Sequence, residues 1–120
     1  MEIDVVQTVI PAGQALSPEV DIGTKSLVAI SLPANWTAEA GLSFSVSFDG
    51  GDTWGELVDN TNTAITVPPV TIENDLPAQI AVNPAQWQGI TALKIRSGTA
   101  ADPVNQVDAV TVSLVTRLVS

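Results

Sequence analysis

Leu42-Ser-Phe-Ser-Val-Ser-Phe48 is the stretch that decides the fold, because apolar residues alternate with serine along its whole length. Successive side chains of a strand point to opposite faces, so this period of two predicts a half-buried β-strand. Further along the chain, residues 90–96 and 110–118 show the same alternation and are also predicted strands. A register slip of one residue would turn Arg117 inward, so we expect this side chain to face water.

Shorter apolar segments, separated by turn residues, fill much of the remaining chain. Residues 27–32 are almost continuously apolar, which predicts a strand covered on both faces. Eight prolines and eight glycines are spread along the chain and leave few windows for a long helix. Further short strands are predicted at residues 5–10, 16–20, 56–58, 64–67, 70–72 and 79–82.

The spacing of these segments is typical of an all-β sandwich or barrel. We expect residues 1–120 to form a single jelly-roll-like antiparallel β-sandwich of about eight strands, since one compact domain suits this length. The sequence shows no internal repeat and no linker. The predicted core between the two sheets consists of Leu42, Phe44, Val46, Leu93, Ile95, Val110, Val112 and Leu114.

The composition makes most enzyme classes improbable. The chain has no cysteine and no histidine, so the usual zinc, copper and iron sites lose their commonest ligands. Proton transfer near neutral pH also loses its usual agent, and a serine nucleophile would have only Lys25 or Lys94 as its base. We therefore expect a protein that is not an enzyme and uses no cofactor and no metal.

The charge balance also narrows the set of partners. Thirteen acidic residues against four basic ones give a net charge of −9, which disfavours nucleic acid and anionic membranes. The first residues are acidic where a signal peptide would be basic, so we expect a soluble protein made inside a cell. A mean hydropathy of +0.30 with 14% charged residues predicts that some apolar surface meets a partner.

The most specific local motif is Ser47-Phe-Asp-Gly-Gly-Asp-Thr-Trp54. It resembles the Asp box, a β-hairpin motif of sialidases and many other β-proteins. Asp49 is expected to accept hydrogen bonds from amides of its own turn, while the glycines supply positive φ angles. A solvated turn is preferred over a calcium site or a sugar-processing site. The residues given this structural turn role are Asp49, Gly50, Gly51, Asp52, Thr53 and Trp54.

Two segments each place a tryptophan after a proline, at residues 34–40 and 84–88. Such segments suit a single helical turn or a short loop at the edge of a sheet. Trp36 and Trp87 are expected to plug the ends of the sandwich. The loops that carry them are also predicted to contact a partner, together with an N-terminal arm at residues 1–9 that includes Ile3 and Val5.

Four short segments follow one another along the chain: Ile10-Pro-Ala-Gly-Gln-Ala-Leu-Ser17, Trp87-Gln-Gly-Ile90, Leu93-Lys-Ile-Arg-Ser-Gly-Thr99 and Pro103-Val-Asn-Gln106. Taken together and in this order, they resemble a family of small virion structural proteins of tailed bacteriophages. The resemblance implies a virion component, assembled in the cytoplasm of the host bacterium, with no catalytic residues. A capsid decoration or cement protein is preferred, with a neck or tail component as the alternative. The implied partners are the major capsid protein and further copies of the chain, arranged as a trimer.

Residues 90–97 are also similar to the closing strands of discoidin-like, galactose-binding jelly rolls. This similarity keeps a second hypothesis open, a carbohydrate-binding adhesion module on the virion. Sugar platforms need exposed aromatic rings, and the chain has no tyrosine. The decoration hypothesis is therefore preferred.

Overall fold

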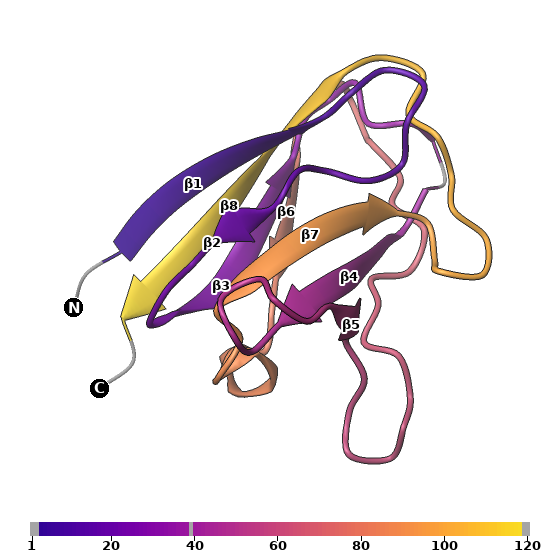
Figure 1. The fold of residues 1–120 in the computed structure, drawn as a ribbon. Helices are drawn as coiled ribbons and strands as arrows, with labels where there is room; N and C mark the ends of the chain where they lie inside the picture. The colour runs from indigo at the N-terminus through magenta and orange to yellow at the C-terminus, as the bar shows by residue number, and fades with distance from the viewer. Residues whose placement is uncertain (1–2, 39, 119–120) are drawn as a thin grey trace.

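The structure, a computed structural model, describes residues 3–38 and 40–118 and folds them into two stacked antiparallel sheets (Figure 1). The prediction of an all-β antiparallel sandwich is confirmed. The first sheet has the order β1 (Ile3–Ile10), β8 (Val110–Leu118), β3 (Lys25–Leu32) and β6 (Ala78–Ala81). The second has the order β2 (Val20–Asp21), β7 (Ala92–Ser97), β4 (Leu42–Ser47) and β5 (Gly55–Glu56).

The alternating stretch that begins at Leu42 forms β4, inside the second sheet. Its apolar residues face the core, as predicted, but Ser43 and Ser47 on the other face are buried as well. Arg96 accounts for the burial of Ser43, because its guanidinium donates to the Ser43 hydroxyl at 3.0 Å and to the Glu56 carboxylate at 2.7 Å. The strand ends at Ser47, so Phe48 leaves the alternation and is 66% exposed.

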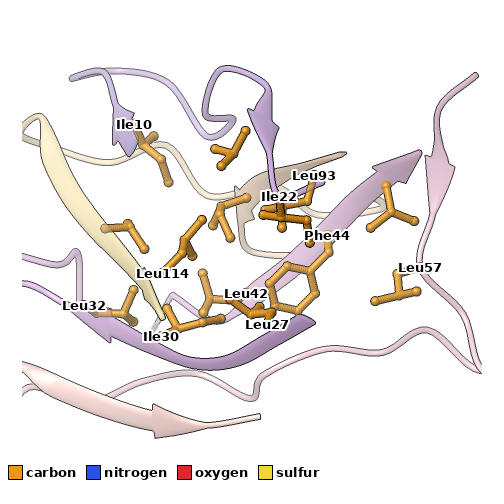
Figure 2. Close-up of a cluster of buried hydrophobic side chains, with 14 of the residues drawn as sticks. Ile10, Ile22, Leu27, Ile30, Leu32, Leu42, Phe44, Leu57, Leu93 and Leu114 are labelled. Carbon is orange, nitrogen blue, oxygen red and sulfur yellow. The ribbon is translucent and has the colours of Figure 1, made fainter. Parts of the chain in front are cut away.

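The core lies between the two sheets, as Figure 2 shows for part of the buried cluster. Burying a large aliphatic or aromatic side chain contributes about 1.5–3 kcal/mol, so this cluster is the main source of stability. Phe44 meets the indole of Trp87 edge to face, with ring centroids 4.9 Å apart. The predicted core is confirmed, since every predicted member is buried: Leu42, Phe44, Val46, Leu93, Ile95, Val110, Val112 and Leu114.

The strand β3 corrects one sequence prediction. Leu27, Ile30 and Leu32 are buried, but Val28 and Ala29 are partly exposed, so the strand is not covered on both faces. The outer face of the first sheet has no further layer over it within the described residues. A bulge between Leu27 and Ala29 also shifts the register with β8.

The short predicted strands are only partly formed. Residues 16–20 and 64–67 contribute isolated bridges, Leu16 to Arg96, Ala64 to Val58 and Val67 to Leu42, besides β2 itself. Residues 70–72 form no strand. The prolines at positions 68 and 69 lack the amide donor that a sheet ladder needs, which accounts for the break between these segments.

Residues 3–38 and 40–118 contain one helical turn, the 3₁₀-helix η1 (Pro84–Trp87). Asn83 caps it by accepting the Ala85 amide at 3.1 Å, and the proline begins the turn where no amide is needed. This agrees with the predicted helical turn at residues 84–88. Around residue 34 the chain makes a tight turn, in which the Trp36 amide donates to the Pro33 carbonyl at 3.0 Å.

Candidate functional site

Asp49 organises the turn between β4 and β5. Its Oδ1 atom accepts hydrogen bonds from the Ser47 hydroxyl at 2.7 Å and from the Thr53 amide at 2.9 Å. Gly50 and Gly51 have φ angles of 76° and 101°, a region that residues with a Cβ atom rarely adopt. The contact with the Thr53 amide and the glycine angles are as expected from the sequence, whereas the contact with the Ser47 hydroxyl was not predicted.

The same contacts set the electrostatics of the turn. They lower the pKa of Asp49 from 3.8 to about 2, with the hydrogen bond from the Ser47 side chain as the largest cause and that from the Thr53 amide next. The indole nitrogen of Trp54 donates to the Gly51 carbonyl at 2.9 Å and folds the ring back onto the hairpin. The turn is therefore held by contacts among its own residues.

Phe48 and Trp54 border a hollow of about 320 Å³ beside this turn, which we call the aromatic hollow. The Phe48 ring is mostly exposed, and Lys94 places its ammonium nitrogen 4.4 Å from the centroid of the Trp54 ring. Apolar rings thus stand next to carboxylate and hydroxyl groups. The lining residues are Val46, Phe48, Asp49, Thr53, Trp54, Gly55 and Glu56.

Sequence reasoning missed this hollow. The alternating pattern placed Phe48 with Phe44 and Val46, and only the end of β4 at Ser47 frees its ring. The contact between Lys94 and Trp54 depends on the pairing of β7 with β4, which sets Lys94 opposite Ser45. The one sequence signal was the pair of glycines after Phe48, which marks a turn there.

The outward face of β1 carries a row of exposed apolar side chains, Ile3, Val5 and Val9, which we call the β1 row. Val5 is 62% exposed. In register with β8 the row continues onto Val115, which lies opposite Val5. Ile3 and Val5 are therefore accessible to a partner, as the predicted interface requires, and Val9 extends that surface.

The structure contradicts the other half of the predicted interface. Trp36 is 4% exposed and Trp87 is fully buried, so neither side chain can contact a partner in this conformation. Trp36 donates from its indole nitrogen to the Ala40 carbonyl at 2.8 Å, and Trp87 packs on Phe44. Both rings are used inside the fold, which agrees with their other predicted role as plugs. Met1 and Glu2, the first two residues of the predicted arm, lie outside the described residues.

The part of the chain that the structure describes has no group of three or more acidic side chains arranged to hold a metal ion. None of its helices is long and apolar enough to cross a membrane. Two exposed features are the candidate sites, the β1 row and the aromatic hollow.

Comparisons with known proteins bear on the fold. No family model and no curated protein matches the chain. An F5/8 type C domain of a Bacteroides fragilis protein is similar in structure, with a TM-score of 0.53 and 12% identity over 96% of this chain and 73% of that one. At this identity the similarity shows a shared β-sandwich fold.

Two further solved structures align less well. The Yersinia pseudotuberculosis-derived mitogen has a TM-score of 0.38 and 15% identity, over 99% of this chain and 87% of that one. The K3 adhesin domain of Lys-gingipain from Porphyromonas gingivalis has a TM-score of 0.37 and 11% identity, over 93% and 71%. The chain is thus a β-sandwich domain similar in fold to the F5/8 type C domain.

Proposed function

We propose that this chain is a non-enzymatic structural protein of a tailed bacteriophage virion, a capsid decoration or cement protein that binds the major capsid protein. The observation that carries the proposal is the β1 row, an exposed apolar surface on a strand at the edge of its sheet. The resemblance of the sequence phrases to small virion proteins supplies the biological setting.

The surroundings of the β1 row favour protein binding. In register across the first sheet, Val5 lies opposite Val115, which lies opposite Ala29. The next row joins Gln7, Ser113 and Ser31, which are polar but uncharged. Arg117, opposite Ile3, is the one charged residue that these registers add beside the row, so the face loses little when it is desolvated. Each large apolar side chain buried there contributes about 1.5–3 kcal/mol.

Many copies on one shell would strengthen a modest contact. A decoration protein meets a lattice of identical subunits, and a trimer would engage several of them at once, so the contacts multiply into avidity. The surplus of carboxylates, which gives a net charge of −9, keeps the outward surface soluble. Neither task needs a catalytic side chain.

Cosedimentation with phage shells that lack the protein tests the proposal. We expect saturable binding, and we expect Ile3→Ser with Val5→Ser to weaken it about tenfold or more, given the apolar area removed. Leu76→Ser with Val58→Ser is the matched control, because both side chains are exposed and lie outside β1. Equal weakening by the two pairs would contradict the assigned surface, and binding to tails but not shells would replace decoration with a neck or tail role.

The aromatic hollow favours a second candidate, a carbohydrate-binding adhesion module. The exposed Phe48 ring offers an apolar face to a pyranose, and Asp49, Thr53 and Glu56 offer hydrogen-bonding groups beside it. A glycan array tests this candidate. Saturable binding that Phe48→Ala abolishes and Leu76→Ala preserves would support it, whereas an array with no saturable signal would remove it.

A further inference from the structure

Two strand edges open onto the same side of the sandwich. β1 is one of the two outer strands of the first sheet, and β2 is one of the two outer strands of the second (Figure 1). Between them lies a groove of about 460 Å³, which we call the edge groove. Its lining residues are Val6, Gln7, Thr8, Val9, Pro18, Glu19, Val20 and Asp21.

The β1 side of the edge groove presents backbone groups that can pair. All eight residues of β1 pair with β8 on one side, and no other described strand pairs with the opposite side. A strand in a sheet directs its amides and carbonyls to both sides, so part of the β1 backbone faces the groove. These groups meet either water or an added strand.

β1 also lacks the usual features that protect an edge strand. It is eight residues long, contains no proline or glycine, and its register with β8 is uninterrupted. Its one charged residue, Asp4, forms an ion pair with Lys25 of the same sheet. An edge this long and regular is a ready template for another strand.

The walls of the edge groove define the chemistry of that strand. Thr8 and Val20 are more than nine-tenths buried and give the groove a partly apolar floor. Glu19 and Asp21 are both exposed, and the lining contains no basic residue. Three of the four basic residues are engaged elsewhere: Lys25 with Asp4, Arg96 with Glu56, and Lys94 over Trp54.

We propose that the edge groove binds an extended basic segment of another protein, which adds to β1 as a fifth strand of the first sheet. Alternate side chains of the segment face the apolar floor, and its Lys or Arg residues lie near Glu19 and Asp21. A second copy of this chain fits less well, because it brings the same carboxylates and the same net charge of −9. The inference rests on the proposed function only in that the domain acts by binding a protein.

An NMR titration tests the inference without any capsid. The probe is the peptide acetyl-Lys-Val-Thr-Val-Lys-Val-Thr-Lys-amide at low ionic strength, and the control peptide has Glu in place of every Lys. We expect saturable shifts at the amides of residues 6–9 and 18–21, with slower hydrogen exchange in β1, for the basic peptide alone. Shifts confined to other surfaces, or equal binding of the acidic peptide, would overturn the proposal.

A pair of variants isolates the two carboxylates. Asp21 accepts the Gly23 amide at 2.9 Å, and Asp21→Asn keeps that acceptor, so Glu19→Gln with Asp21→Asn removes charge while preserving the turn. We expect this pair to raise the peptide Kd about fivefold or more. Glu73→Gln with Asp75→Asn makes the same change of charge outside the groove and should leave the Kd within about twofold.

If both pairs of substitutions weakened peptide binding equally, the effect would be a general attraction between the basic peptide and an acidic protein. That result would overturn the assigned site. Self-association that light scattering shows without peptide, and that the basic peptide reverses, would make a second copy the occupant of the groove and overturn the proposal. The cosedimentation assay tests the β1 row with Ile3→Ser and Val5→Ser, whereas the peptide titration tests the edge groove with other variants. Failure of the titration and failure of the decoration role can therefore be told apart.

Discussion

Ser47 donates a hydrogen bond of 2.7 Å from its hydroxyl to Oδ1 of Asp49, and the same hydroxyl oxygen accepts the Gly51 amide at 2.9 Å. The serine thus links the carboxylate to the backbone of the turn that follows β4. Oδ1 also accepts the Thr53 amide, and both hydrogen bonds are stronger to the ionised carboxylate than to the neutral acid, because a charged acceptor attracts the donors more strongly. The turn between β4 and β5 is therefore coupled to a single titration.

That coupling predicts acid sensitivity of the turn. Asp49 has a pKa of about 2 in the folded chain, against an ordinary value of 3.8. The ionised carboxylate therefore stabilises the folded chain fully above pH 3.8, and this stabilisation is lost as pH falls toward 2. Asp49→Asn should lower the Tm near pH 6, and the difference from the wild type should shrink between pH 4 and pH 2. Thermal scans across this range measure the gap. Asp52→Asn is the control, and a constant gap for Asp49→Asn would contradict the linkage.

The two buried tryptophans should respond differently to loss of the indole nitrogen. Trp36 donates to the Ala40 carbonyl, whereas the Trp87 nitrogen has no hydrogen-bond partner among the described residues. Trp36→Phe should therefore cost about 1 kcal/mol more than Trp87→Phe, since only the former loses a hydrogen bond. Urea unfolding of the two variants measures the difference, and equal losses would refute this account.

The buried side chain of Gln106 links two distant segments of the chain, at Ser97 and at Thr37, by hydrogen bonds. It is fully buried, donates to the Ser97 hydroxyl at 2.8 Å and accepts the Thr37 amide at 2.9 Å. Gln106→Ala removes both bonds and leaves a cavity, so we expect a loss of about 2–4 kcal/mol in unfolding free energy. The exposed Gln7 makes one side-chain bond, to Ser113, and Gln7→Ala should stay within about 0.5 kcal/mol.

Gly41 is required by a close backbone approach. A Cβ atom there would collide with the Val67 carbonyl, which pairs with Leu42, while a Cβ at Gly55 would meet nothing within 4 Å. Gly41→Ala should destabilise the chain by about 1–3 kcal/mol. Gly55→Ala should be neutral or stabilise by up to about 1 kcal/mol, because it only restricts the unfolded chain. Chemical denaturation of the pair tests this contrast.

Much of the sandwich follows from local pattern. The strands β4, β7 and β8 and their inward residues can be predicted because one buried face imposes a period of two on each strand. The outer side is less predictable. Whether Val28 or Phe48 is covered depends on whether another layer lies above it and where the strand ends. Those facts come from pairing between distant segments.

The candidate sites are less predictable for the same reason. Trp36 and Trp87 sit among small and polar residues that show no period, so the sequence left two roles open, plugs of the sandwich and contacts with a partner, and only the structure shows that both rings are buried. Ile3 and Val5 were within reach of prediction because they alternate along a strand. The edge groove was not, since it exists only because β1 and β2 are the outer strands on one side.

The place of β8 in the first sheet has a consequence for the order of events during synthesis. β8 lies between β1 and β3 and is the partner of both, yet it comes from residues 110–118. At about 5–20 residues per second, β1 is synthesised roughly 5–20 s before its partner β8. During that interval β1 has no partner strand for its backbone hydrogen bonds. The first sheet therefore forms late, and its formation requires that the nascent chain has not aggregated by then.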